Sequence, residues 1–304
     1  MHWGLRFDFR NPDLASTSMA ERYAGALDIV AWAEQLGARH VTLCEHHGSS
    51  DGYLPSPLPM AAAMAARTTT MRLLIAALIV PFHDPLRLAE DIAVVDNIAG
   101  GRLDLIVAAG YNPEEFAMFD VPLASRVPRV VETVATLRAA FTGEPFEFRG
   151  RTVRVTPKPA QPGGPRIFLG GSSDAAARRA AHIADGFQPS VPDVWEAYRD
   201  ELRKLGKPDP GPASRNHTVT TFLAEDVERG WDVYGPFFLH EMNGYGAWQQ
   251  GDVQTAFRMV GSVDELRETE RPSVVLHPLC GGTPPALAWE SLRLFEHDVL
   301  PAVA

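Results

Sequence analysis

The chain has few cysteines and no long uncharged apolar stretch. Its two cysteines, Cys44 and Cys280, lie far apart in the 304 residues, and neither belongs to a C-x-x-C pair. The sequence therefore predicts neither a disulfide framework nor a zinc module. No run approaches the ~18 apolar residues of a membrane-spanning helix, and the N-terminal MHWGLRFDFR lacks a signal-peptide core. We expect a cytoplasmic protein without a membrane segment.

An excess of positive charge is also absent. Lysine and arginine number 28 against 38 acidic residues, for a formal net charge of -10, and the two signs are interspersed. This balance argues against a nucleic-acid or anionic-membrane partner. Hydrophobic residues make up 45% of the chain, which is enough for a large buried core.

The stretch from Met71 to Gly110 predicts a strand, a helix and a second strand. Residues 73–80 and 103–109 are apolar runs typical of strands buried on both faces of a parallel sheet. An amphipathic pattern fills the interval between Pro85 and Gly100, where glycine provides the helix stop. Two parallel strands joined by one helix form a right-handed βαβ unit.

The rest of the chain continues this alternation, and Ser18 with Glu21 predicts a capping box at the first helix. Further strands are expected at 3–9, 40–44, 166–169, 186–190, 217–223 and 273–277, with a surface hairpin at 146–155. Helices are expected at 19–36, 58–66, 126–141, 174–183, 194–205, 226–239, near 263–268, and at 285–300.

About eight strands alternating with helices predict an α/β fold, a single (β/α)8 TIM barrel spanning residues 1–304. A doubly wound open sheet is the rival fold, but residues 8–12 after the first strand are not a glycine-rich phosphate loop. In a barrel the loops after the strands form the active site. That rule brings together residues 46–47, 81–83, 110–111, 170–173 and Ser190.

The central stretch resembles the bacterial luciferase-like flavin monooxygenase family. The matching residues are P-x-H-D-P at 81–85, L-x-x-A-E-D-x-A-x-x-D at 86–96, G-G-R-x-D-L at 100–105 and the terminal Gly110. The resemblance extends from Gly4 to Pro301. It implies the same barrel fold and a flavin cofactor.

His46 is the candidate catalytic residue. A histidine just beyond a strand end can exchange a proton near neutral pH, although it can equally be a structural histidine. Glu45-His46-His47 resembles the family motif whose first histidine lies beside the flavin and is needed for activity. By this resemblance His46 is catalytic and Glu45, at the cofactor, orients its neighbours, while His47 is expected to be structural.

The flavin ring is expected at Ala76 and Ala77. Small residues in a strand often only permit tight packing, but in luciferase-like proteins this point forms a bulge against which the flavin rests, often through a cis peptide bond that does not involve proline. We carry that role, with the cis geometry, to Ala76 and Ala77. Gly110 and Tyr111 are expected to contact the cofactor at the end of the fourth strand.

The flavin phosphate is expected at Gly170, Gly171, Ser172 and Ser173. This turn opens a helix, so free N–H groups and two hydroxyls can meet an anion, although Ser173 or Asp174 can instead be an ordinary N-cap. Family members place the phosphate here, and many add an arginine where this chain has Ala109. Arg126 either compensates for that missing arginine or is a solvated surface residue.

Three other motifs have weaker meaning. G-x-S-x-G at 48–52 is followed by a proline-rich stretch, not by the helix of a nucleophile elbow, and His240-Glu241 lacks the second histidine of a zinc motif. We therefore predict no hydrolase and no metal. Residues 237–248, with His240, Tyr245 and Trp248, are either a substrate-facing lid or a packed helix edge.

By resemblance, the predicted function is that of a two-component monooxygenase. It would take reduced FMN from a separate flavin reductase and use oxygen on a small organic substrate, with a homodimer as the usual assembly. One alternative is hydride transfer with a deazaflavin, whose acidic tail would need a basic groove such as Arg126, Arg129 and Arg166 can supply. The other alternative is a flavin-binding barrel without catalytic activity.

Overall fold

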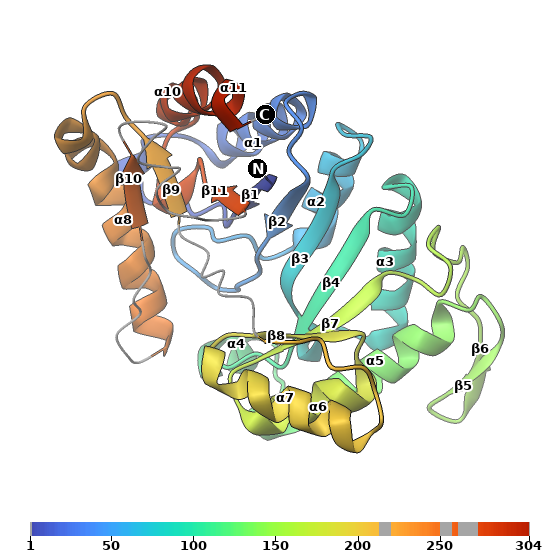
Figure 1. Cartoon of the computed structure of the whole chain (residues 1–304). Coiled ribbons are helices and arrows are strands. Elements are labelled where there is room, and N and C mark those ends of the chain that lie inside the picture. The colour runs from blue at the N-terminus through green and yellow to red at the C-terminus, as the bar shows by residue number, and fades with distance from the viewer. Residues whose placement is uncertain (1, 213–219, 250–256, 261–272, 304) are drawn as a thin grey trace. The chain divides into compact units, whose positions relative to one another are not determined.

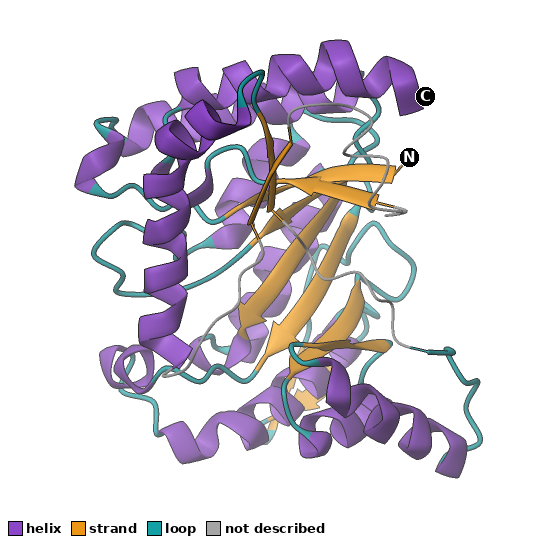
Figure 2. Cartoon of the chain, turned by 60° about the vertical axis from the view of Figure 1, so that its left-hand side comes forward, coloured by secondary structure: helices purple, strands orange, loops and turns teal. Residues whose placement is uncertain are grey.

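The computed structural model of the chain is drawn in Figure 1. The chain divides into two compact units. The structure describes residues 2–212, 220–249, 257–260 and 273–303. Unit 1 comprises Met1–Pro55 together with Asn216–Ala304, and unit 2 comprises Ser56–Arg215. Strands and helices alternate along the chain in both units (Figure 2).

Unit 1 contains parallel strands in the order β10-β9-β11-β1-β2. These are β1 (His2–Phe7), β2 (His40–Leu43), β9 (Thr220–Leu223), β10 (Phe257–Val260) and β11 (Ser273–Leu276). Its helices are α1 (Met19–Gln35), α8 (Val227–Gln249), α10 (Pro285–Leu294) and α11 (Leu300–Val303), with a π-helix η6 (Phe295–Val299) and the 3-10 turns η1 (Asp13–Ala15) and η5 (Cys280–Gly282).

The two ends of the chain are joined in unit 1 by strand pairing and aromatic packing. Leu5 in β1 pairs with Val41 of β2 on one side and with Leu276 of β11 on the other. The ring of Trp3 packs 4.9 Å from that of Phe295, measured between centroids. Because these apolar side chains are buried, the hydrophobic effect holds β1 between elements from opposite ends of the sequence.

Unit 2 contains parallel strands in the order β3-β4-β7-β8. These are β3 (Arg72–Ile79), β4 (Leu103–Ala108), β7 (Arg166–Gly171) and β8 (Gly186–Pro189), and an antiparallel hairpin consists of β5 (Phe146–Phe148) and β6 (Arg151–Val153). The helices are α2 (Pro57–Ala65), α3 (Pro85–Ile98), α4 (Pro113–Met118), α5 (Arg126–Ala140), α6 (Asp174–Ile183) and α7 (Trp195–Lys204), with 3-10 turns η2 (Val80–Phe82), η3 (Leu123–Ser125) and η4 (Pro192–Val194).

The predicted βαβ unit is confirmed as β3, α3 and β4. Asp84 caps α3 by accepting from the backbone N–H groups of Leu86 and Arg87. At its other end Gly100 and Gly101 both adopt positive φ, as the helix stop requires. The predicted capping box at α1 is also confirmed, since the Ser18 and Glu21 side chains each accept from the other residue's backbone N–H.

Several predicted boundaries are wrong. The first strand ends at Phe7 instead of residue 9, because Phe9 has a φ of 64° that breaks the extended chain. The strand β7 continues through Gly170 and Gly171, which pair with β8, so the turn there consists only of Ser172 and Ser173. The final helix is interrupted by the π-helix, and the strand β10 was not predicted. The helix expected near 263–268 lies outside the described residues.

The largest difference is the length of α8. It was expected to end at residue 239, but it continues to Gln249 even though Pro236 and Gly244 lie inside it. A Cβ added at Gly244 would lie 2.7 Å from an Arg10 Nη1 atom. Glycine at this helical position therefore leaves room for a buried arginine, and the segment 237–248 is helix up to Trp248.

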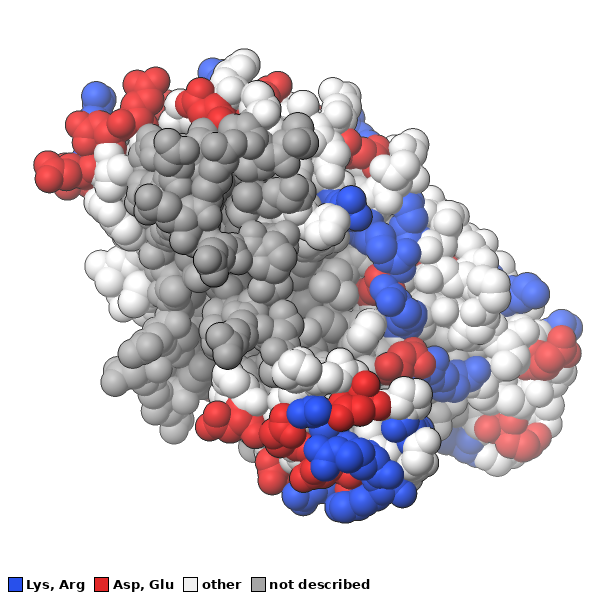
Figure 3. Space-filling view, viewed as in Figure 1, with Lys and Arg blue, Asp and Glu red and all other residues white. Residues whose placement is uncertain are grey.

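Charged side chains of both signs are interspersed on the face drawn in Figure 3, including the area around α7. In that helix Arg199 pairs with Glu196 and Arg203 with Asp200. Within the described ranges no helix combines the length and apolar character needed to cross a membrane.

Candidate functional site

A buried polar cluster lies at the carboxyl ends of three neighbouring strands in unit 1. Asp8 follows β1, the pair Glu45 and His46 follows β2, and His277 follows β11. Since β1 pairs in parallel with both β2 and β11, these ends lie at one edge of the sheet. Burying a charged group costs free energy unless an opposite charge or a hydrogen bond stabilises it. The contacts of each charged side chain therefore determine what its burial costs.

His46 is held among aromatic rings. Its side chain is buried, and its ring meets the ring of Tyr53 edge-on at 5.0 Å and that of Tyr245 at 6.4 Å. Its backbone N–H donates to the Leu54 carbonyl at 3.2 Å. The structure therefore holds the imidazole in a tightly packed position, and its catalytic role stays a prediction.

Glu45 contacts the second histidine of the motif. Its Oε1 lies 2.9 Å from His47 Nε2, and both side chains are buried. Glu45 thus lies where it could orient His47, and the roles expected for the two residues stay predictions.

The tyrosines beside His46 are joined to each other and to an arginine. The hydroxyls of Tyr53 and Tyr245 lie 2.9 Å apart, and Arg6 Nη2 donates to the Tyr245 hydroxyl at 2.7 Å. Burial raises the pKa of both phenols well above the ordinary value. Both therefore remain neutral hydroxyls across the physiological pH range.

Asp51 is the centre of a second group of contacts. Its Oδ2 accepts from Arg10 Nη1 at 2.6 Å and lies 2.7 Å from His240 Nε2, while Ser49 donates to Oδ1. Burial alone would raise the pKa of Asp51, but the Arg10 charge and these hydrogen bonds outweigh it and lower the pKa. Ser49 and Asp51 of the G-x-S-x-G string are thus engaged in hydrogen bonds, and no helix follows the string until Pro57.

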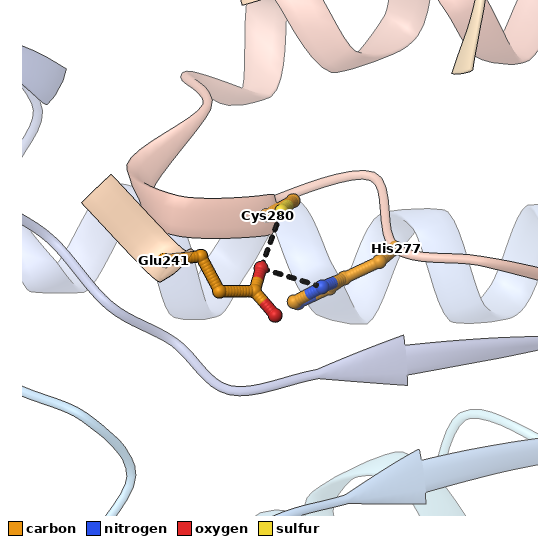
Figure 4. Close-up of side chains that lie close together, drawn as sticks. All are labelled: Glu241, His277 and Cys280. Atoms are coloured by element: carbon orange, nitrogen blue, oxygen red, sulfur yellow. Dashed lines mark hydrogen bonds and ion pairs between the residues drawn. The ribbon is translucent and has the colours of Figure 1, made fainter. Parts of the chain in front are cut away.

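A third group lies between α8 and β11, where Figure 4 shows Glu241, His277 and Cys280 converging. Glu241 Oε2 accepts from the Cys280 thiol and lies 3.3 Å from His277 Nδ1. The opposite ring nitrogen, Nε2, lies 3.4 Å from Asp8 Oδ1. All four side chains are buried.

The charges of this group shift its pKa values in opposite directions. Burial would lower the pKa of His277, but the carboxylates of Asp8 and Glu241 outweigh it and raise the pKa. Burial and the Glu241 charge raise the pKa of the Cys280 thiol well above its ordinary value. For Glu241, burial is outweighed by His277 and Arg6, so its pKa is well below the ordinary range.

In unit 2 the peptide bond between Ala76 and Ala77 is cis, which is the geometry that the sequence analysis expected there. The pairing of β3 with β4 shifts register between Ala76 and Leu78, so the expected bulge is also present. Gly110, after β4, has a φ of 70°, and Tyr111 beside it is 43% exposed.

The turn before α6 has the ordinary capping geometry. Ser173 is the N-cap and accepts from the backbone N–H of Ala176, and Ser172 and Ser173 are both exposed. In the same unit, Arg126 donates to the Leu123 carbonyl. Burial and the nearby charge of Arg126 lower the pKa of Arg179 on α6, so two guanidinium groups of like charge lie near each other.

The expected site residues are thus distributed over both units. Glu45 and His46 belong to unit 1, whereas the alanines, Gly110, Tyr111, Arg126 and the turn 170–173 belong to unit 2. Sequence reasoning missed Asp8, Arg10 and Asp51, although Asp8 and Arg10 directly follow the first strand. The sequence analysis also missed that Glu241 lies close to His277 and Cys280, which form an H-x-x-C pair.

Comparison with known proteins identifies the family to which the chain is similar. The sequence profile of luciferase-like monooxygenases matches residues 1–272. An uncharacterised protein of Mycobacterium bovis is 35% identical over 151 residues, which are 48% of this chain and 50% of that protein. The chain therefore spans about half the length of that relative.

Solved structures match over the whole length. The monooxygenase RslO1 from Streptomyces bottropensis superposes with a TM-score of 0.79 and 24% identity, covering 100% of both chains. The oxygenating constituent of 3,6-diketocamphane monooxygenase from Pseudomonas putida, solved with FMN, gives 0.71 and 19%, covering 99% of this chain and 98% of that one. An F420-dependent secondary alcohol dehydrogenase gives 0.70 and 14%, covering 100% and 99%.

These likenesses, with the parallel strands alternating with helices, confirm the predicted α/β fold of TIM-barrel type. The profile match over most of the chain has a further consequence. The protein belongs to the luciferase-like monooxygenase family.

Proposed function

We propose that the protein is a flavin-dependent oxidoreductase, acting as the oxygenating component of a two-component monooxygenase. It would take reduced FMN from a separate reductase and use oxygen to oxidise a small organic substrate. The observation that carries the proposal is His46, fixed at the end of β2 against Tyr53 and Tyr245 in a chain of this family.

The residues of unit 2 fit the two ends of an FMN molecule. The bulge at Ala76 and Ala77 carries only methyl side chains and would leave room for the ring. Arg126 and Arg179, whose like charges repel, would both be stabilised by an anion, and a phosphate is such an anion. Arg126 would thereby supply the positive charge that Ala109 lacks.

When bound, reduced flavin supplies the electrons that activate oxygen for transfer to the substrate. His46 would hold or deliver a proton at a ring nitrogen, as a histidine side chain does in general acid-base catalysis. The rings of Tyr53 and Tyr245, which pack against His46, would exclude water around it. Their neutral hydroxyls offer hydrogen bonds to a substrate carbonyl or a heteroatom.

A second candidate is hydride transfer with a deazaflavin, whose acidic tail would need a basic groove near the barrel mouth. The structural likeness to an F420-dependent dehydrogenase supports the same reading. A flavin-binding protein without catalytic activity is the third. Three further expectations stay predictions: a single domain over residues 1–304, a homodimer and a cytoplasmic location. Light scattering after gel filtration tests the homodimer.

The test is an anaerobic fluorescence titration of the purified protein with reduced FMN and, separately, with the deazaflavin. Micromolar binding of reduced FMN together with substrate-dependent oxygen consumption is the expected result. Tighter binding of the deazaflavin, with hydride transfer that needs no oxygen, would replace the monooxygenase by a dehydrogenase. If a cofactor binds but no aldehyde, ketone or sulfide is turned over, the protein would be a flavin-binding protein without catalytic activity.

A further inference from the structure

The convergence of Glu241, His277 and Cys280 has the geometry of a metal site. One ligand atom from each residue lies within 4.8 Å of the other two, and the three side chains are buried. In a tetrahedral zinc site, bonds of about 2.0–2.3 Å place the ligand atoms roughly 3.3–3.8 Å apart. Small rotations of these side chains are enough to surround one ion.

The donor set also selects the kind of ion. A thiolate, an imidazole and a carboxylate are the three side-chain ligands that Zn²⁺ uses, whereas Ca²⁺ and Mg²⁺ prefer oxygen alone. His277 and Cys280 are separated by two residues and are joined by a turn in which the Cys280 N–H donates to the His277 carbonyl. This short spacing is typical of paired zinc ligands.

The surroundings provide the partners that metal ligands need. Asp8 Oδ1 lies 3.4 Å from Nε2 of His277, on the far side of the ring from Glu241. A carboxylate behind a histidine is the usual second partner at zinc sites, because it orients the ring. Arg6 Nη1 lies 3.3 Å from the Oε1 atom of Glu241, which leaves Oε2 to face the other two ligands.

Two buried ring nitrogens point to a missing ligand. Although ion pairs lie near, neither Nδ1 nor Nε2 of His277 has a hydrogen bond of good geometry to any residue that the structure describes, and the same holds for Glu241 Oε1. Buried polar atoms normally find a hydrogen-bond partner. An ion at Nδ1 would satisfy the ring and leave its Nε2–H for Asp8.

We propose that Glu241, His277 and Cys280 bind one zinc-like divalent cation. The ion would connect α8 to the turn η5 after β11. These elements are already in close contact, because a Cβ at Gly281 would lie 1.9 Å from the Phe237 carbonyl oxygen. Tyr245 lies one turn beyond Glu241 on α8, so the ion would also fix the helix face that carries Tyr245 toward Tyr53.

The proposal is tested with cobalt, which takes zinc sites and is coloured. Metal-free full-length protein is titrated with Co²⁺ alone, without flavin, and the spectrum is recorded. One equivalent should produce a thiolate-to-cobalt charge-transfer band in the near ultraviolet and the visible bands of a tetrahedral ion. Zn²⁺ should displace the cobalt and raise the melting temperature.

Cys44→Ala is the matched control, since Cys44 is the other buried cysteine. It should keep the band, Cys280→Ser should lose it, and His277→Gln should weaken cobalt binding at least tenfold. If Cys280→Ser does not fold, a charge-transfer band retained by Cys44→Ala still assigns the cobalt-bound thiolate to Cys280, because the chain has only two cysteines. A wild-type protein without the band, or a band that Cys44→Ala removes, overturns the proposal.

Discussion

Asp8 and His277 face each other at the ends of adjacent parallel strands, with 3.4 Å between Asp8 Oδ1 and His277 Nε2. Neither side chain is exposed to solvent. Burial would raise the pKa of Asp8, yet His277 outweighs it and lowers that pKa. A buried ionic contact therefore joins β1, near one end of the chain, to β11, near the other.

Asp8→Asn removes the negative charge of this contact, so His277 and Arg10 lose the carboxylate with which both are paired. Breaking a buried pair from one side costs about 3–5 kcal/mol, so we expect a fall of about 3 kcal/mol in the free energy of unfolding. Urea denaturation followed by circular dichroism measures it. Asp200→Asn, at an exposed pair with Arg203 on α7, is the control and should change little. Equal effects of the two variants would contradict this account.

His46→Ala should abolish most of the turnover while the protein stays folded. General acid-base catalysis contributes about 100-fold to 10,000-fold, so we expect a drop in kcat of about 100-fold or more. The assay is oxygen consumption with reduced FMN and a responsive substrate. His182→Ala removes an exposed histidine that pairs with Glu201, and it should keep the wild-type rate. Full activity of His46→Ala would remove the catalytic role.

Arg126→Ala should weaken FMN binding if Arg126 replaces the arginine missing at Ala109. A charged hydrogen bond contributes about 1.5–3 kcal/mol, which corresponds to a Kd at least roughly tenfold higher. The anaerobic fluorescence titration measures it. Arg178→Ala on α6 is the control, because Arg178 is exposed and pairs with Asp174. A Kd unchanged by Arg126→Ala would assign that side chain to the solvated surface.

Gly110→Ala should destabilise the protein more than Gly37→Ala. Both glycines have positive φ, so alanine costs about 1–2 kcal/mol at each. A Cβ at Gly110 would also lie 2.9 Å from Ile79 Cγ2 and 3.0 Å from Phe116, whereas at Gly37 it would meet no atom of the described residues within 4 Å. The difference between the two unfolding free energies measures this crowding, and its absence would mean that the neighbours move aside freely.

Asp104 should stabilise unit 2 in a pH-dependent way. It pairs with Arg72 at 2.6 Å and Arg166 at 3.0 Å, and although burial opposes them, these arginines lower its pKa below the ordinary 3.8. A lowered pKa contributes stability that is present above pH ~4 and is lost as the pH falls through the folded-state value.

Urea denaturation of the wild type and Asp104→Asn, from about pH 6 to about pH 2, tests this. We expect Asp104→Asn to be less stable by about 1 kcal/mol near pH 6, with the difference shrinking toward low pH. A difference that does not vary with pH would show that Asp104 acts through packing or hydrogen bonds instead of its charge.

Much of the fold could be predicted because the apolar runs and helix stops are local signals. Leu103 to Ala108, for example, is apolar at every position except Asp104 and is bounded by glycines at Gly101 and Gly110. The placement of His46 at a strand end followed from the same pattern. The register shift and the cis bond at Ala76 and Ala77 matched an expectation that the family resemblance supplied.

What could not be predicted depends on contacts between distant residues. Gly244 favours a helix end locally, but the approach of Arg10 makes glycine the residue that fits inside α8. Likewise Glu241 and His277 are separated by another strand, and only the packing of α8 on η5 brings them together. No local pattern encodes such pairings, which is why the cluster was missed.

The position of β1 between β2 and β11 determines when the protein can finish folding on the ribosome. Unit 2 is continuous in sequence, so its strands can pair as soon as they emerge. The first strand is made long before β11, so it finds its second neighbour only when residues 273–276 leave the exit tunnel. Until then the nascent chain exposes an unpaired apolar edge, and a chaperone that binds such edges is expected to stay on it longest at β1.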